Sequence, residues 1–168
     1  MNVKIREYRD TDYEACRGLW VELTERHRQI YGDPTIGGDD PGQGFDNYLA
    51  NPDRRFTWVA KVEGTVVGMT GLFVKGEEGT VEPAVVAEGF RSRGLGSMLV
   101  SQAISEARQT GIRFLSAQPV ARNIEAISFL DKMGFDILGQ LEFFQDLQPE
   151  RGREWKSGVT LHKNKLRY

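Results

Sequence analysis

The sequence predicts a mixed α/β fold, with a mostly antiparallel sheet of six to seven strands and helices on both faces of it. Short stretches of alternating apolar residues recur along the chain, separated by apolar residues at helical spacing. A strand–helix–strand unit near the middle requires one parallel strand pair, because this connection crosses over the sheet. The expected order is β-α-α-β-β-β-α-β-α-β-β, in a single domain over residues 1–168.

The first half of the chain is expected to supply a strand, two helices and two paired strands. The stretch 3–8 alternates as an edge strand does, and apolar residues from Tyr13 to Ile30 recur at helical spacing. Segment 31–44 is dense in Gly, Pro and Asp, which predicts an irregular loop. A short helix follows, and then a strand pair joined by a tight turn within 56–74.

The second half contains the crossover unit and the last strands. Pro83 lies inside the predicted strand 80–87 and indicates a bulge, because proline has no N–H to donate to a neighbouring strand. The elements expected after it are a helix at 94–110, a strand at 112–118, a helix at 123–134, and strands at 136–147 and 154–165 around a turn at 148–153.

Composition limits the class of protein. The 168 residues are 39% hydrophobic and carry a net charge of −2, as expected for a soluble domain with a core and no nucleic-acid partner. Cys16 is the sole cysteine, so no disulfide forms within the chain. The N-terminus lacks a signal-peptide core, and no apolar run approaches the roughly 18 residues of a membrane span. We therefore expect a cytoplasmic protein without a membrane partner.

The stretch FRSRGLGSMLV, at 90–100, combines cations and glycines at the predicted start of a helix. A strand that turns into a helix directs free N–H groups outward, and the helix dipole adds partial positive charge there. Gly94 and Gly96 let an anion approach the backbone, and Arg91 and Arg93 add charged donors. This combination predicts a phosphate site, although a tight turn without a ligand shows the same glycines.

Two common phosphate motifs do not fit this turn. A P-loop ends in Gly-Lys-Ser/Thr, which is absent. A dinucleotide fingerprint needs a third glycine, and Leu99 stands at that position.

VVAEGFRSRGLGSMLV resembles the central motif of the GNAT N-acetyltransferases, Arg/Gln-x-x-Gly-x-Gly/Ala, and ARNIEAISFLDKMGF is similar to the second motif of that family. The expected order of elements also matches the family over nearly the whole chain. Both motifs in order are more specific than either alone. The matching positions are Arg91, Gly94, Gly96, Asn123, Ala126, Gly134 and Phe135.

The resemblance implies that the ligand is coenzyme A and that the reaction is acetyl transfer from acetyl-CoA to an amine, with no metal. In the family the pyrophosphate rests on the turn, and the pantetheine adds to the edge of the preceding strand. The residues this assigns to acetyl-CoA are Val86, Glu88, Arg91, Ser92, Arg93, Gly94, Leu95, Gly96, Ser97 and Asn123.

Acetyl transfer needs a base, because an alkylamine with a pKa of about 10.4 is mostly protonated at neutral pH. Glu82 lies on the strand that would carry the thioester and is the candidate base. Many family members have a carboxylate two residues earlier, where Thr80 stands, so a purely structural role for Glu82 is equally open. The backbone N–H of Val86 is the candidate donor to the oxyanion.

One position departs from the family. Leu130 stands where many members have a tyrosine that protonates the leaving thiolate. Three readings stay open: the thiolate leaves unaided or takes a proton from water, a hydroxyl of Ser128 or Tyr168 replaces the tyrosine, or the protein binds coenzyme A and transfers slowly or not at all.

The acceptor is expected to be a small cationic amine or a peptide amine, since the carboxylates at 33–46 would attract a cation. A non-catalytic coenzyme A-binding sensor or interaction domain is the alternative, and a nucleotide-phosphate binder is a third. The last two strands have edges through which a homodimer would form. Five aromatic residues are candidates to line an acceptor pocket, although such residues are more often core: Trp20, Tyr31, Phe45, Tyr48 and Phe144.

Overall fold

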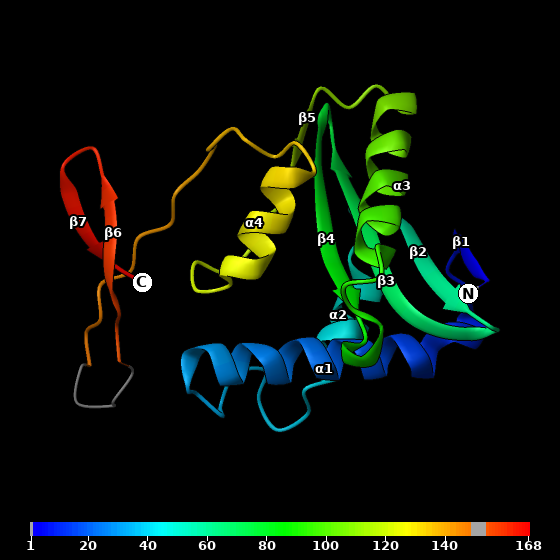
Figure 1. The fold of residues 1–168 in the computed structure, drawn as a ribbon, viewed down its shortest axis with the longest axis horizontal. Helices are drawn as coiled ribbons and strands as arrows, with labels where there is room; N and C mark the ends of the chain where they lie inside the picture. The colour runs from blue at the N-terminus through cyan, green and yellow to red at the C-terminus, as the bar shows by residue number, and fades with distance from the viewer. Residues whose placement is uncertain (1, 149–153) are drawn as a thin grey trace.

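The computed structural model describes residues 2–148 and 154–168, and a five-stranded sheet forms its centre (Figure 1). The strands lie in chain order across the sheet. The first four pair antiparallel, and the fifth is parallel to the fourth, as the crossover unit predicts. The strands are β1 (Val3–Glu7), β2 (Arg54–Val62), β3 (Thr65–Lys75), β4 (Glu78–Val86) and β5 (Phe114–Ser116).

Helices cover both faces of the sheet, which confirms the predicted layering. One face packs against α1 and α2, and the other packs against α3 (Figure 1). In the described part of the chain, no helix is both long and apolar enough to cross a membrane. The helices are η1 (Asp10–Asp12), α1 (Tyr13–Tyr31), α2 (Gln43–Ala50), η2 (Glu88–Phe90), α3 (Leu95–Gln109) and α4 (Ile124–Lys132).

Each face of the sheet has its own apolar core. On the α3 side, Leu72 of the sheet packs with Leu99 and Val100 of the helix. On the other side, Cys16 packs with Phe45 and neighbouring aromatic rings. Burial raises the pKa of the Cys16 thiol to about 12, so this side chain is an unreactive core residue.

A β-bulge interrupts the pairing of β3 with β4. Glu82 and Pro83 of β4 stand opposite the single residue Gly71 of β3, which confirms the bulge predicted at the proline. The extra residue reverses the alternation of side chains along β4. Val81 packs into the core on the α3 side, whereas Val85 packs into the core on the α1 and α2 side.

Gly71 permits the close approach that the bulge requires. A Cβ atom at this position would collide with the hydroxyl oxygen of Tyr48 and would lie 2.5 Å from the carbonyl oxygen of Glu82. Only a residue without a side chain therefore fits at position 71, between the bulge of β4 and the Tyr48 side chain of α2.

The C-terminal part of the chain differs from the prediction. The sheet has five strands, not six or seven, and β6 (Ser157–Leu161) and β7 (Asn164–Arg167) form a separate two-stranded ribbon. The strand expected at 136–147 is extended chain, because a strand needs a neighbour for its N–H and C=O groups and none pairs with it among the described residues.

The single strand expected at 154–165 is also wrong, because the ribbon turns within it. His162 and Lys163 have positive φ angles of 46° and 70°, which the two central residues of a tight hairpin turn require. The turn expected at 148–153 falls, from residue 149 on, outside the described residues.

We expect Gly71→Ala to lower the free energy of unfolding by about 1–3 kcal/mol, because the added methyl group overpacks the bulge. Gly18→Ala is the matched control. Gly18 lies in α1 with nothing within 4 Å of an added Cβ, so alanine should stabilise the helix by about 0.5–1 kcal/mol. Urea unfolding curves measure both changes. Equal effects at the two glycines would contradict this account of the bulge.

Candidate functional site

The strands β4 and β5 diverge shortly after they meet. They pair at three positions, and the last of these is Thr80 opposite Ser116, whose hydroxyl oxygens lie 3.0 Å apart. Beyond this pair β4 continues to Val86, with no strand beside it on that side among residues 2–148 and 154–168. The second half of β4 therefore presents an open strand edge, to which an extended ligand can bind as an added strand.

Val86 directs its backbone groups into this open wedge. The next residue, Ala87, donates its N–H to the carbonyl of Val67 on β3 at 2.8 Å. Antiparallel ladders alternate, so Val86, opposite Gly68, has its N–H and C=O directed away from β3. The Val86 carbonyl accordingly accepts a hydrogen bond from the Arg91 guanidinium at 3.0 Å. The Val86 N–H is thus directed into the wedge.

The turn after β4 exposes the beginning of α3. Ser92 and Gly94 have positive φ angles of 60° and 80°, which turn the chain sharply into the helix. Gly94 is the N-cap residue, and no side chain in the described residues caps it by a hydrogen bond. The first N–H groups of α3 are left for a ligand, and the helix dipole favours an anion.

Both arginines of the turn are fixed beside these N–H groups. Arg91 is held by its bond to Val86, and Arg93 donates to the carbonyl of Gly89 at 2.9 Å and covers the ring of Phe90 at 5.2 Å. Their positive charge therefore lies next to the start of α3 without pairing to a carboxylate there, as no ion pair of either is found in the described part of the chain.

Three residues in the first turn of α3 contribute differently to this site. Leu95 is buried and offers only its backbone, whereas Ser97 is exposed. A Cβ at Gly96 would make ordinary contacts, 3.6 Å from Phe129 and 3.9 Å from Val86. The protein itself has room for a side chain at Gly96, so the glycine leaves space for something else.

Glu82 lies at the bulge on the side of β4 opposite to Val81. Its side chain keeps contact with solvent, yet the surrounding protein atoms desolvate it enough to raise the pKa of the carboxyl above its ordinary value. A solvent-accessible carboxylate with a raised pKa is suited to accept a proton near neutral pH.

The Tyr48 hydroxyl packs beside Gly71 opposite the bulge, but this residue belongs to the core. Burial raises its pKa to about 12, and its oxygen lies 2.6 Å from the hydroxyl oxygen of Thr57. Tyr48 therefore remains protonated and held in place, which fits a structural role.

Glu88, which the family resemblance assigns to the pantetheine, lies just beyond the end of the strand edge. The strand ends at Val86, and Glu88 begins the short helix η2. Its N–H donates to the carboxylate of Glu22 on α1 at 3.1 Å, so it is not available to an added strand. Glu22 is a residue that sequence reasoning missed, and no local signal marks it, since its partner lies 66 positions away.

Asn123, predicted to contact the ligand, caps α4. Its side-chain oxygen accepts a hydrogen bond from the N–H of Ala126 at 3.2 Å. In the same helix, Leu130 is half-buried and Ser128 is exposed. Tyr168 pairs with Lys156 in the ribbon, on the far side of α4 from β4 (Figure 1). Of the two replacement hydroxyls considered, Tyr168 is therefore removed from the wedge.

Most of the aromatic candidates for an acceptor pocket are core residues. Phe45 and Tyr48 are buried, and Trp20 packs against both, with ring centroids 6.2 and 5.6 Å away. Tyr31 lies under the guanidinium of Arg122 at 4.7 Å. Phe144 is not a core residue, because it is 74% exposed in the extended segment after α4.

The acidic stretch 33–46, which spans the loop before α2 and the first turn of that helix, uses most of its carboxylates locally. Asp40 pairs with Arg17 at 2.5 Å, and Asp46 accepts a hydrogen bond from the Tyr13 hydroxyl at 2.6 Å. Asp33 accepts bonds from the backbone and hydroxyl of Thr35. These contacts shape the loop and leave its negative charge beside α1.

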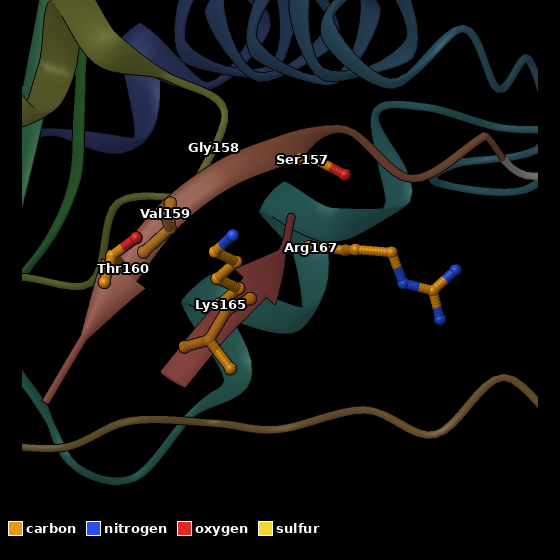
Figure 2. Close-up of a pocket in the computed structure, with 7 residues that line it drawn as sticks. Ser157, Gly158, Val159, Thr160, Lys165 and Arg167 are labelled. Atoms are coloured by element: carbon orange, nitrogen blue, oxygen red, sulfur yellow. The ribbon is translucent and has the colours of Figure 1, made fainter. Parts of the chain in front are cut away.

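A shallow hollow on the C-terminal ribbon is distinct from the wedge. Figure 2 shows that the side chains around it come from the two strands of the ribbon alone. No cluster of three or more potential metal ligands occurs within residues 2–148 and 154–168. The residues that line the hollow are Ser157, Gly158, Val159, Thr160, Lys165, Leu166 and Arg167.

Comparison with known proteins identifies the family. The profile described as "Acetyltransferase (GNAT) family" matches residues 14–135, which include the bulged strand, the turn and both following helices. The chain belongs to the GNAT acetyltransferase family. The match to this acetyltransferase profile ends at Phe135, before the extended segment and the ribbon.

Solved structures share the fold of this acetyltransferase. An aminoglycoside N-acetyltransferase, AAC(6')-Iy, solved with a bisubstrate analogue of CoA, is 17% identical with a TM-score of 0.64, covering 87% of this chain and 99% of that chain. A Trypanosoma brucei acetyltransferase is 21% identical with a TM-score of 0.63, covering 87% and 100%. The ribosomal-protein-S18-alanine N-acetyltransferase of Escherichia coli is 18% identical with a TM-score of 0.61, covering 79% and 77%.

We expect Gly94→Ala and Gly96→Ala to differ in stability. Gly94→Ala forces alanine to a φ of 80° and should lower the free energy of unfolding by about 1 kcal/mol. Gly96→Ala makes only ordinary contacts within a helix and should be neutral or stabilising. Thermal or urea unfolding compares them, and strong destabilisation by Gly96→Ala would show that packing requires this glycine.

Proposed function

We propose that the protein is an N-acetyltransferase that uses acetyl-CoA to acetylate a primary amine by direct attack in a ternary complex. The observation that carries the proposal is the open edge of β4, which leads into the uncapped start of α3. An extended thiol arm fits a strand edge, and a diphosphate fits a helix N-terminus. Coenzyme A joins these two chemical groups in one molecule.

The diphosphate would bind at the turn between β4 and α3. The N–H groups at the start of the helix accept an anion, and Arg91 and Arg93 are already positioned beside them. Ser92 and Ser97 add exposed hydroxyls. The space above Gly96 lets the phosphates approach the backbone. The assignment of these residues rests on their geometry and on the family motif.

Chemistry would take place near the bulge. The amine nitrogen attacks the thioester carbonyl carbon, the C–N bond forms, and the C–S bond then breaks to release the thiolate. The Val86 N–H points into the wedge and is the donor to the oxyanion. Glu82 accepts the amine proton, directly or through a water, because its raised pKa suits this role.

The acceptor is proposed to be a small cationic amine or a peptide amine. The named neighbours act on an aminoglycoside and on the alanine of a ribosomal protein, which are examples of these two classes. Asp40 and Asp46 both pair with the single guanidinium of Arg17, which leaves net negative charge on the α1 side of the sheet, where Glu82 lies near Tyr48. A cation would be attracted to this side.

A second candidate function is coenzyme A binding without turnover. The observation that favours it is Leu130 in α4. This apolar side chain stands where many family members carry the tyrosine that protonates the leaving thiolate. Leu130 does not by itself exclude turnover. A thiol has an ordinary pKa of roughly 8.5, so the thiolate of coenzyme A can leave without a proton from the protein. Turnover with any amine decides between the two candidates.

Isothermal titration of CoA and of acetyl-CoA should show binding by the wild type that Arg91→Ala/Gly94→Ala weakens by about tenfold or more, because one charged donor and the turn geometry are lost. Arg108→Ala, at the other end of α3, is the control and should bind as the wild type does. Absence of wild-type binding would refute both candidate functions, and binding without release of thiol from any screened amine would favour the second.

The pH dependence of turnover tests Glu82. A base works when deprotonated, so kcat/KM should rise with pH through a pKa above the ordinary glutamate value of about 4.3. Glu82→Gln should lower kcat by about 10²- to 10⁴-fold and remove this limb. Glu78→Gln, on the same strand, is the control. A Glu82→Gln enzyme with unchanged kcat and the same limb would assign the base elsewhere.

A further inference from the structure

A carboxylate of α1 holds the backbone just beyond the end of β4. Glu88, the first residue of η2, donates its N–H to the carboxylate of Glu22 at 3.1 Å. The N–H groups that open a helix have no acceptor within it, so Glu22 supplies an acceptor that the turn itself cannot. Because the two residues lie 66 positions apart, this bond fixes the place of the turn relative to α1.

Apolar packing fixes both partners of this bond. Leu19 and Leu23 flank Glu22 on α1, and both pack into the apolar cluster that contains Ala87 at the end of β4. Ala87 also donates its N–H to the carbonyl of Val67 at 2.8 Å. The Glu22 side chain is exposed, yet its backbone and that of its partner are anchored in the same cluster.

The carbonyls on either side of Glu88 position the two arginines of the turn. Arg91 donates to the carbonyl of Val86 at 3.0 Å, and Arg93 donates to the carbonyl of Gly89 at 2.9 Å. These carbonyls lie two residues before and one residue after Glu88. A bond that holds the N–H of Glu88 therefore also restrains the backbone from which both guanidinium groups are placed.

We propose that Glu22 is a positioning residue for the diphosphate of acetyl-CoA, acting through η2 on Arg91 and Arg93. This inference rests on the proposed binding of coenzyme A at the turn between β4 and α3. Without the bond from Glu22, the turn loses a restraint, and part of the binding free energy would go into ordering it. With the bond, the arginines are already in place when the diphosphate arrives.

Glu22 acts here as a hydrogen-bond acceptor and not as a charge. A carboxylate close to the turn repels a diphosphate, so the charge of Glu22 opposes binding while the bond that it accepts favours binding. The side-chain oxygen of glutamine can accept the same N–H without a charge. Glutamine and alanine at position 22 should therefore have different effects.

Isothermal titration of CoA tests this difference. Glu22→Ala should raise Kd by about five- to tenfold, because the bond to a charged acceptor is lost, whereas Glu22→Gln should bind within about twofold of the wild type or more tightly. Glu14→Ala removes an exposed carboxylate from the first turn of the same helix and should bind as the wild type does. In steady-state kinetics Glu22→Ala should raise KM for acetyl-CoA and leave kcat unchanged.

Hydrogen exchange without ligand gives an independent measurement. The amides of residues 88–94 should exchange faster in Glu22→Ala than in the wild type, Glu14→Ala or Glu22→Gln, while the amides of α1 should be unchanged. Faster exchange throughout the chain would overturn the proposal in favour of a general structural role.

Two binding results would also overturn the proposal. Equal Kd values for the wild type and Glu22→Ala would show that the bond does not assist the diphosphate, and Glu22→Gln as weak as Glu22→Ala would show that charge is what matters. Absence of CoA binding by the wild type would refute the proposed function together with this inference, whereas wild-type binding that Glu22→Ala retains in full would refute the inference alone.

Discussion

The bulge of β4 opposite Gly71 is the constraint on which the candidate site depends. A regular strand would keep its alternate side chains on one face, but the extra residue turns Val81 toward one core and Val85 toward the other. Both ends of the strand are thus anchored in packed apolar clusters. The strand between these anchors cannot straighten without removing a buried side chain from its core, which fixes the position of Glu82.

The anchoring of β4 also determines where the wedge opens. β5 follows β4 only as far as Thr80 and then departs, so the part of β4 beyond the bulge keeps one free edge among the described residues. The turn that follows is fixed by arginine bonds to its own carbonyls and by the link from Glu22 to Glu88. Most of the proposed contacts with acetyl-CoA are consequently backbone groups, whose direction is set by the fold rather than by side-chain identity.

The chemistry proposed for the site depends on few side chains. Glu82 is the group whose pKa is shifted in the direction that proton abstraction requires, and desolvation rather than a charged neighbour is the cause. Leu130 offers no proton, so the leaving thiolate would depend on solvent or on its own modest basicity. An acetyltransferase built in this way relies on orientation and on the oxyanion donor more than on a paired acid and base.

The sequence by itself determined the family, the helices on both sheet faces, the bulge at Pro83 and the turn before α3, because each follows from local signals such as spacing, glycine and proline. Tertiary structure decided the rest. The link between Glu22 and Glu88, the burial of Phe45 and Tyr48, and the raised pKa of Glu82 arise from segments distant in sequence. The segment 136–147 has a strand's pattern, but a strand forms only where a neighbour accepts its backbone bonds, and no local pattern specifies that neighbour.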